Sequence, residues 1–289
     1  QGRAQHARFQ PDMHTHLVER LELETDLRHA LERGELMAVY QPAIDIRTGA
    51  VHGFEALVRW QHPTRGLLNP GSFVEMAEET GLIVPVDRWV LKEACNKMAE
   101  WRQTHPSAKD ITISVNLSTR QFSRKDLLET VKEVLEESRI PAKSLVLEIT
   151  ESALMSNLSQ VSDNMKGLWE MGVGLAVDDF GTGYSSLSYL YRYPVNTLKI
   201  DRSFVSNMEI DRDKETLVRT VIGMAESLDL RVVAEGVETL AQRDSLENMN
   251  CEIVQGFHYS KPVSAEQAGD YLAGKCPWKG DLAEENATL

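Results

Sequence analysis

Eight short apolar segments alternate with stretches of helical periodicity along most of the chain. Helical spacing of apolar residues is clear over 87–103 and 125–138. Short apolar runs separated by amphipathic helices are typical of parallel strands joined by crossover helices, and eight of them favour a closed barrel over an open sheet. The segments are LMAVYQPAIDI, VHGFEALVRW, ITISVNLS, SLVLEIT, GLAVDDF, NTLKID, RVVAEGVE and CEIVQGF.

The connection between the first two segments departs from this rule. Only RTGA, residues 47–50, separates them, whereas a parallel crossover needs roughly a dozen residues or more. The two segments should therefore form an antiparallel hairpin. We predict an α/β fold, a modified (β/α)₈ TIM-like barrel with an antiparallel first strand.

The two ends of the chain lack the alternation of apolar segments and helical stretches that predicts the barrel. Leucines at 17, 21, 27 and 31 predict a helix over 15–33, ended by Gly34. Residues 1–14 show no period, and we expect them to be a linker remnant of an upstream domain. One domain is expected over 15–275. The polar, unpatterned residues 276–289 are expected to form a C-terminal tail.

Composition narrows the class of protein and of partner. The formal charge of −13 over 289 residues argues against binding of a nucleic-acid polymer through a basic surface. A small phosphorylated substrate is still compatible, because a bound divalent cation can reverse the local electrostatics. The chain has no apolar run of membrane-spanning length, so no membrane contact within it is expected. Three cysteines without a C-x-x-C pattern suggest a reducing, cytoplasmic location. Membrane attachment of a longer protein stays open.

Polar side chains interrupt the apolar segments where strands should end. In a barrel, the carboxyl ends of the strands converge on one mouth, where active sites of this architecture lie. The sequence therefore predicts several carboxylates, amides and one lysine in a single place. These residues are Glu55, Asn116, Glu148, Asp178, Asp179, Lys199, Glu235, Glu238 and Gln255.

Such a cluster of acids requires a positive partner, because like charges at short distance repel strongly. Carboxylate and amide oxygens suit Mg²⁺ or Mn²⁺ better than zinc. Two ions about 3.5–4 Å apart would fit this number of acids, with Lys199 orienting water or neutralising charge.

Simpler interpretations exist for individual residues. Any one acid at a strand end is more often a helix cap or a surface group, but the same feature on seven successive strands is hard to attribute to chance. Gly181 and Gly183 could simply relax a turn, and this is about as plausible as contact with phosphate. The DFG string also occurs in protein kinases, yet no H-R-D loop or glycine-rich phosphate loop accompanies it.

The motifs resemble those of a known family. Glu55-Ala56-Leu57 within EALVRW, the VDDFGTGYSS stretch and QGFHYSKP are similar to motifs of the EAL-domain phosphodiesterases of the bacterial second messenger cyclic di-GMP. The resemblance runs from about Leu21 to Pro262 and on into the final helix. The resemblance implies a barrel with a reversed first strand. It also implies hydrolysis of cyclic di-GMP to linear pGpG by in-line attack of water at two metals, Mg²⁺ or Mn²⁺.

The resemblance further implies a role for each matching residue. The metal ligands would be Glu55, Asn116, Glu148, Asp178, Asp179 and Glu235. Catalysis would rest on Glu235, as general base or holder of the second metal's water, on Lys199 and on Glu55. Substrate binding would involve Gln41, Leu57, Arg59, Asp179 and Gln255. Support of the site and its loop would come from Glu151, Glu238, Gly181, Thr182 and Gly183.

The resemblance also suggests partners and competing functions. Members of this family form homodimers, and the first helix resembles the linker to an upstream sensory or diguanylate-cyclase-like domain, although no GGDEF string occurs here. One alternative is a catalytically silent receptor or scaffold for cyclic di-GMP, although no expected ligand is missing. A second is a metal-dependent enzyme that acts on other phosphodiesters, such as linear oligonucleotides.

Overall fold

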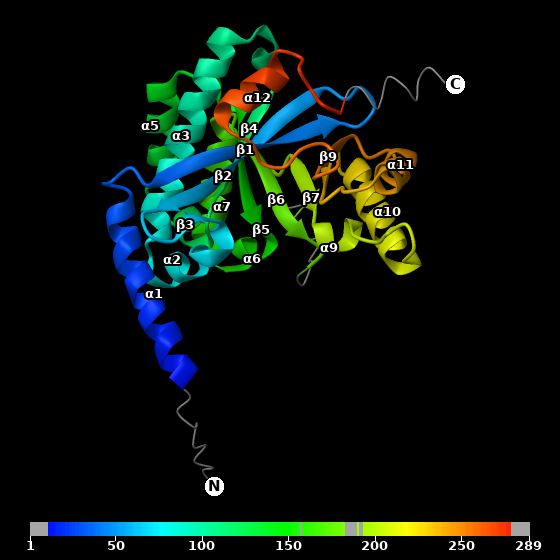
Figure 1. Ribbon diagram of the computed structural model, residues 1–289. Coiled ribbons are helices and arrows are strands. Elements are labelled where there is room, and N and C mark those ends of the chain that lie inside the picture. The colour runs from blue at the N-terminus through cyan, green and yellow to red at the C-terminus, as the bar shows by residue number, and fades with distance from the viewer. Residues whose placement is uncertain (1–10, 157, 183–189, 191–192, 279–289) are drawn as a thin grey trace.

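Strands of a single mixed sheet form the centre of the molecule. We describe residues 11–156, 158–182, 190 and 193–278 of a computed structural model (Figure 1). The strands within these residues are β1 (Leu36–Asp45), β2 (Val51–His62), β3 (Gly66–Leu68), β4 (Thr112–Asn116), β5 (Leu145–Thr150), β6 (Gly174–Phe180), β7 (Thr197–Ile200), β8 (Arg231–Glu235) and β9 (Ile253–Gln255).

The sheet closes into a barrel through its first strand. β1 pairs antiparallel with β2, with Gln41 opposite Glu55, and antiparallel with β9, with Ile44 opposite Val254. The sheet then runs β9-β8-β7-β6-β5-β4-β2, and these neighbouring pairs are parallel. The prediction of a modified barrel with an antiparallel first strand is confirmed. The short connection works because the Asp45 carboxylate accepts hydrogen bonds from the backbone N–H groups of residues 47 and 48, which tightens the turn.

Helices surround the barrel, with α3 and α5 on one side of the strands and α10 and α11 on the other (Figure 1). The helices are α1 (Pro11–Ala30), α2 (Val74–Thr80), α3 (Ile83–Thr104), α4 (Thr119–Phe122), α5 (Leu127–Ser138), α6 (Glu151–Ser156), α7 (Leu158–Glu170), α9 (Arg202–Val205), α10 (Arg212–Ser227), α11 (Leu240–Asn248) and α12 (Ala265–Leu272). Short 3₁₀ turns cover Pro70–Ser72, Pro106–Lys109 and Ala142–Ser144. The helices expected over 87–103 and 125–138 correspond to α3 and α5.

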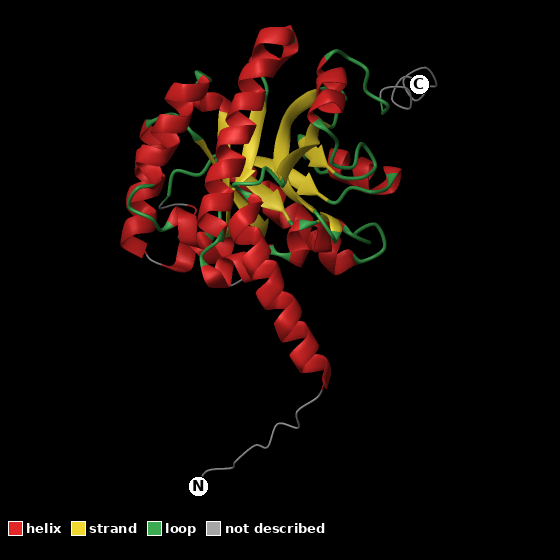
Figure 2. Cartoon of the chain, turned by 60° about the vertical axis from the view of Figure 1, so that its left-hand side comes forward, coloured by secondary structure: helices red, strands yellow, loops and turns green. Residues whose placement is uncertain are grey.

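The first helix differs from its expected bounds. α1 begins at Pro11, inside the segment expected to be a linker, and projects from the rest of the molecule (Figure 2). It ends at Ala30, after which residues 31–34 form a turn in which Gly34 adopts a φ of 66°. Gly34 therefore lies four residues beyond the end of α1 instead of directly after it. It still adopts the left-handed conformation that is expected of a glycine at a helix end.

The hydrophobic pattern does not predict two features of the structure. β3 is a three-residue strand that pairs antiparallel with β2 and is too short to show a period. Trp278 lies in the segment expected to be a tail, yet it is 3% exposed, and its Nε1 donates a hydrogen bond 2.9 Å long to the Gly49 carbonyl. Its ring also packs edge-on against Tyr271. Packing of one large aromatic thus extends the folded unit beyond residue 275.

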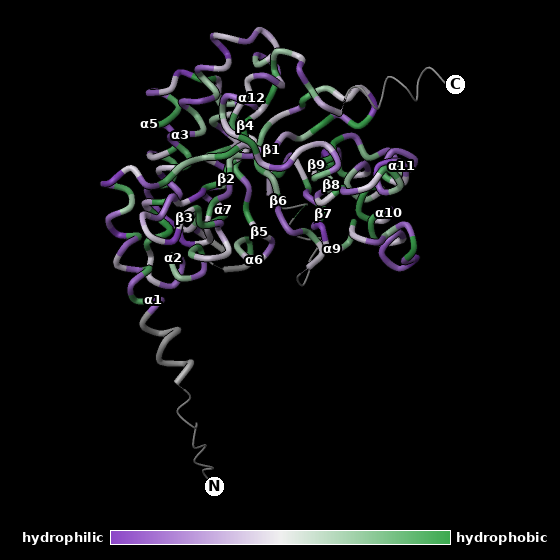
Figure 3. The backbone as a smooth tube through the Cα atoms, viewed as in Figure 1, coloured by the Kyte–Doolittle hydropathy of each residue, from purple (hydrophilic) through white to green (hydrophobic). Residues whose placement is uncertain are grey.

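Apolar residues fill the space between the barrel and the helices. The strands are mostly hydrophobic along their length, whereas polar positions concentrate on the outer loops (Figure 3). Trp60, Phe54 and Phe122 are each at most 1% exposed. Among the described helices, none is long and apolar enough to cross a membrane.

Helices that follow the strands begin with side-chain caps. Ser118 accepts a hydrogen bond from the backbone N–H of Gln121 at the start of α4, and Asp201 accepts one from Ser203 at the start of α9. Thr239 and Gln242 form a reciprocal capping box on α11. These caps define the turns at the carboxyl ends of the strands, where the polar residues converge.

Candidate active site

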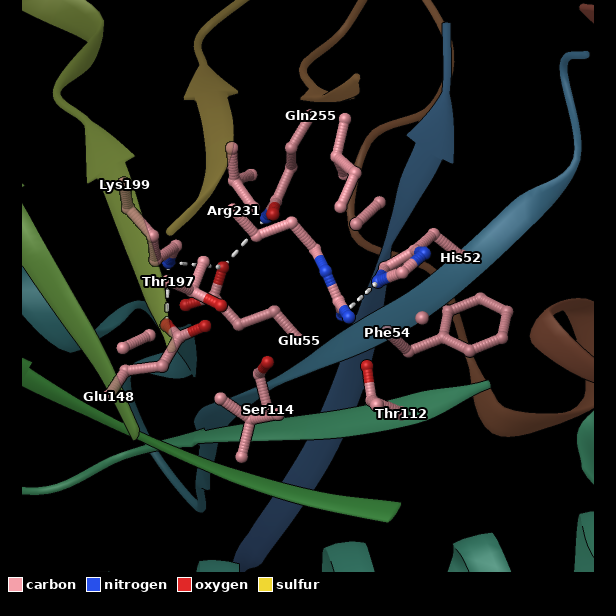
Figure 4. Close-up of a pocket in the computed structure, with 16 residues that line it drawn as sticks. His52, Phe54, Glu55, Thr112, Ser114, Glu148, Thr197, Lys199, Arg231 and Gln255 are labelled. Carbon is pink, nitrogen blue, oxygen red and sulfur yellow. Dashed lines mark hydrogen bonds and ion pairs between the residues drawn. The ribbon is translucent and has the colours of Figure 1, made fainter. Parts of the chain in front are cut away.

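Lys199 lies at the centre of the predicted acidic cluster. Its Nζ is 2.5 Å from Glu148 Oε2 and 2.6 Å from Glu235 Oε1. It is also 3.4 Å from oxygens of Glu55 and of Asp178. The lysine side chain is 2% exposed, and Figure 4 shows it pointing toward Glu148 and Glu55. Four strands thus bring four carboxylates onto one ammonium group.

Burial and neighbouring charges shift the pKa values of these side chains in different directions. Burial alone would lower the pKa of Lys199, but the surrounding carboxylates raise it well above its ordinary value. Burial raises the pKa of Glu235 to about 7, against the opposing attraction of Lys199. Burial likewise raises the pKa of Glu148, and neighbouring acids add to this effect. Four carboxyl groups thus share one ammonium, and a bound cation would favour ionisation of the acids whose pKa is raised.

Amide side chains orient Glu55. Asn116 Nδ2 donates to Glu55 Oε1 over 2.5 Å, and Gln255 Nε2 donates to Glu55 Oε2 over 2.7 Å. Gln255 Nε2 also contacts Gln41 Oε1, whose own amide donates to the Ser260 carbonyl. These bonds fix the Glu55 carboxylate and leave the Asn116 Oδ1 oxygen as a further oxygen donor.

The adjacent acids of β6 lie at an irregularity rather than at the strand terminus. The pairing of β6 with β7 shifts register between Val177 and Phe180, and regular pairing resumes at Phe180. Asp179 lies within this bulge with a φ of 53°, and its backbone N–H donates to Asp178 Oδ1. The bulge explains how two consecutive acids can serve the same site without burying one in the apolar layer.

The donor set fits a hard divalent cation. Oxygens of Asp178, Asp179 and Glu235 all lie within 4.8 Å of one another. Glu55, Glu148 and the amide of Asn116 supply further oxygens beside them. Carboxylate and amide oxygens without sulfur or imidazole are the ligands that magnesium and manganese prefer.

A cavity of about 220 Å³ opens over this cluster at the barrel mouth. Seven residues selected from the sequence line it: Gln41, Glu55, Leu57, Asp178, Glu235, Glu238 and Gln255. Arg202 and Phe257 also line it and were missed. Each lies two residues after a strand ends, Arg202 after β7 and Phe257 after β9, so their position, though not their residue type, was a signal for the barrel mouth. Phe257 is 54% exposed, which is unusual for a large aromatic side chain.

Other site residues predicted from the sequence lie outside the lining of this cavity. Arg59 lies on β2, two positions beyond Leu57, and donates to the Val58 carbonyl. Glu151 accepts a 3.4 Å hydrogen bond from the backbone N–H of Gly181. Thr182 donates to the Asp179 carbonyl through both its backbone and its hydroxyl. Gly183 lies outside the described residues.

Two loops that carry site residues are joined at close range. The N–H of Val237, two residues after Glu235, donates to the Gln255 carbonyl, and the N–H of His258 donates to the Val237 carbonyl. Gly256 permits this approach, since a Cβ atom there would lie 2.1 Å from the Val237 oxygen. The carboxyl ends of β8 and β9 are thereby held in a fixed relation.

Beneath the acidic cluster the barrel interior is small (Figure 4). A cavity of about 40 Å³ is lined there by Ser114, Thr197 and Ala176 among others. Arg231 approaches His52 at 3.4 Å at the opposite end of this interior. Phe54, Val146, Val233 and Ile253 also line this cavity, so both polar and apolar side chains support the charged layer.

Fold and site together define a class of protein: a modified α/β barrel that carries carboxylate and amide side chains at the carboxyl ends of its strands. The EAL domain family model matches residues 24–262, and the chain belongs to this family.

Curated relatives and solved structures agree with this assignment. The bifunctional diguanylate cyclase/cyclic di-GMP phosphodiesterase MucR of Pseudomonas aeruginosa is 43% identical over 92% of this chain and 39% of that protein. The cyclic di-GMP phosphodiesterase NbdA of the same organism is 41% identical over 88% of this chain and 32% of that protein. The chain thus spans well under half the length of these relatives. The structure described as the PaMucR phosphodiesterase in complex with c-di-GMP has a TM-score of 0.82, 43% identity, and coverage of 86% of this chain and 99% of that one.

Proposed function

We propose that this domain is a divalent-metal-dependent phosphodiesterase that hydrolyses cyclic di-GMP to linear pGpG. The observation that carries the proposal is the convergence of four carboxylates on buried Lys199 beneath an open cavity at the barrel mouth. The relatives MucR and NbdA are named as cyclic di-GMP phosphodiesterases, which supports this substrate. Mg²⁺ or Mn²⁺ would serve as cofactor, with two ions in each site.

The residues divide into two overlapping ligand sets. Glu55, Asn116, Glu148 and Asp178 would hold one ion, and Asp178, Asp179 and Glu235 would hold the other, with Asp178 shared. When bound, the ions would stabilise negative charge on phosphoryl oxygens and promote ionisation of water. Without them the acidic mouth would repel a phosphodiester, so substrate affinity should also depend on metal.

The side chains of the barrel account for the remaining chemistry. Water forms the new bond to phosphorus while the bond to the 3′ oxygen breaks, and the leaving oxygen gains a proton. Glu235 would either hold the water of the second ion or accept its proton as general base. Lys199 would contact that water and neutralise charge as it develops. Glu55 is held for its role by the amides of Asn116 and Gln255.

Other groups at the mouth fit a cyclic dinucleotide. Leu57 and Phe257 offer apolar surface in the cavity that can contact a base. Gln41 and Gln255 would contact the substrate from β1 and β9, and Arg59 would approach a phosphate from β2. Glu238 lines the same cavity, while Glu151, Gly181 and Thr182 would hold the loop after β6.

The greater length of the relatives suggests a wider context. We infer a homodimer, an upstream sensory or diguanylate-cyclase-like domain that α1 would join to the barrel, and a cytoplasmic location. MucR, a bifunctional diguanylate cyclase/cyclic di-GMP phosphodiesterase by name, is much longer than this chain, which supports an additional domain. Analytical ultracentrifugation of the domain at several concentrations would test the dimer.

Incubation of the domain with cyclic di-GMP and Mg²⁺ or Mn²⁺, followed by chromatography, tests the activity directly. Appearance of pGpG that stops on addition of EDTA is the expected result. Binding of intact cyclic di-GMP without turnover under either ion would instead identify a receptor. Preferential cleavage of short linear RNA in a mixture with cyclic di-GMP would identify the other phosphodiesterase.

A further inference from the structure

Asp87 is a buried acid outside the ligand sets described above. It lies on α3, is 6% exposed, and its Oδ2 accepts two hydrogen bonds from one residue of the β4–α4 turn. These come from the backbone N–H of Ser118 over 3.0 Å and from the Ser118 hydroxyl over 2.5 Å. A buried carboxyl group lowers stability unless its interactions offset the loss of hydration, so its position calls for an explanation.

Ser118 connects this carboxyl group to the site. Asn116, at the end of β4, precedes Ser118 by two residues and donates to Glu55. Between them, the N–H of Leu117 donates to the carbonyl of Glu148 over 2.9 Å. Ser118 also caps α4 through Gln121. The turn is thus held from two sides, by α3 through Asp87 and by β5 through the backbone of Glu148.

We propose that Asp87 is a positioning residue for the first metal site, acting through Ser118 to fix Asn116 beside Glu55 and Glu148. α3 is a 22-residue helix that packs along the barrel, so it offers a rigid support for a turn that follows a five-residue strand. Two hydrogen bonds to a single carboxylate oxygen restrain the turn directly after the ligand. Outer groups that orient metal ligands affect metal affinity without touching the ion.

The inference rests on the proposed function, and metal binding without substrate tests it separately. Mn²⁺ titration followed by electron paramagnetic resonance reports affinity at one fixed pH. Asp87→Ala should weaken Mn²⁺ binding by about 10-fold or more, the usual effect of losing an outer group, whereas Asp87→Asn, which keeps an acceptor, should stay within about 3-fold of the wild type. Turnover of Asp87→Ala should recover at saturating Mn²⁺, so that the metal requirement changes more than kcat.

Two further variants distinguish a positioning role of Asp87 from a general loosening of α3. Asp126→Ala removes another carboxylate that is tied to α3, through Arg88 at 2.6 Å, but does not contact the β4–α4 turn. It should leave Mn²⁺ affinity unchanged. Ser118→Ala should weaken Mn²⁺ binding less than Asp87→Ala, because the backbone donor remains, and it takes the place of Asp87→Ala if that variant does not fold.

Three outcomes would overturn the inference. Asp87→Ala, or Ser118→Ala in its place, could bind Mn²⁺ as the wild type does despite a lower melting temperature, which would leave Asp87 with a structural role alone. Asp126→Ala could weaken binding equally, which would point to loosening of α3. Asp87→Asn could bind as poorly as Asp87→Ala. A wild type that binds Mn²⁺ but leaves cyclic di-GMP intact would refute the proposed function instead.

Discussion

Lys199 Nζ lies 2.5 Å from Glu148 Oε2 in the barrel interior, and both side chains are at most 3% exposed. The ammonium also faces Glu235, Glu55 and Asp178. Lys199→Met would leave these acids without their common partner. Loss of one member of a buried pair typically costs about 3–5 kcal/mol. We expect a decrease of this size in unfolding free energy in urea with EDTA present, together with a fall in kcat of about 100-fold or more.

Added metal should separate the two effects of this substitution. Mg²⁺ would neutralise the acids that have lost their partner and restore much of the lost stability, while kcat would stay low because the ammonium itself is missing. Lys275→Met is a suitable control, since Lys275 pairs with Asp270 on the surface and its side chain is 72% exposed. Loss of stability that Mg²⁺ cannot restore would contradict the assignment of these acids as metal ligands.

Glu55→Gln tests the first ligand set with little change in shape. The glutamine keeps one acceptor oxygen, its NH₂ group gives up the hydrogen bond from either Asn116 or Gln255, and Lys199 keeps Glu148 and Glu235. We expect kcat/KM to fall about 100-fold or more while the melting temperature changes by only a few degrees. Glu252→Gln, on an exposed residue that lines a different cavity, should leave turnover unchanged. Near-normal turnover of Glu55→Gln would exclude Glu55 as a ligand.

Much of this site could be predicted because it depends on features local to the sequence. The four-residue connection before Val51 is sufficient to require an antiparallel hairpin, whatever the side chains around it. Strand ends in a barrel converge, so acids such as Glu55 and Glu235 could be brought together from the order of segments alone.

The features that were missed depend on contacts between distant segments. Trp278 is buried only because Tyr271 and the Gly49 carbonyl are there to receive it. Asp179 was predicted for the cluster, but the bulge in which it lies was not, because a period-two pattern cannot show a shift of register. Phe257 looks like an ordinary strand residue until the cavity beside it is seen.

Gly256→Ala should separate the loops that carry Glu235 and Gln255. The added Cβ would lie 2.1 Å from the oxygen and 2.3 Å from the nitrogen of Val237, both backbone atoms that cannot rotate away. We expect a loss of about 2–3 kcal/mol in unfolding free energy and strongly reduced turnover. Gly223→Ala is the matched control, because no atom lies within 4 Å of its added Cβ on α10. It should raise stability by about 0.5–1 kcal/mol. Similar effects of both substitutions would refute the close approach.

The pH dependence of stability should reveal the buried state of Asp87. Burial raises the pKa of this carboxyl group from 3.8 to about 7, although Ser118 donates to it. The folded state therefore binds a proton that the unfolded state releases above pH 4, so this stabilising contribution is complete at low pH and disappears as pH rises through 7. A difference of about three pKa units corresponds to at most about 4 kcal/mol.

Asp87→Asn removes this titration while it keeps an acceptor for Ser118. Measured by urea denaturation with EDTA, the unfolding free energy of the variant should rise relative to the wild type between about pH 4 and pH 7. The two proteins should be most alike near pH 4 and below, where the wild-type carboxyl group is protonated in both the folded and the unfolded state, and their difference should stop growing above about pH 7. A constant difference across this range would show that Asp87 stays ionised in the folded protein. In that case the two hydrogen bonds from Ser118 outweigh burial in setting its charge.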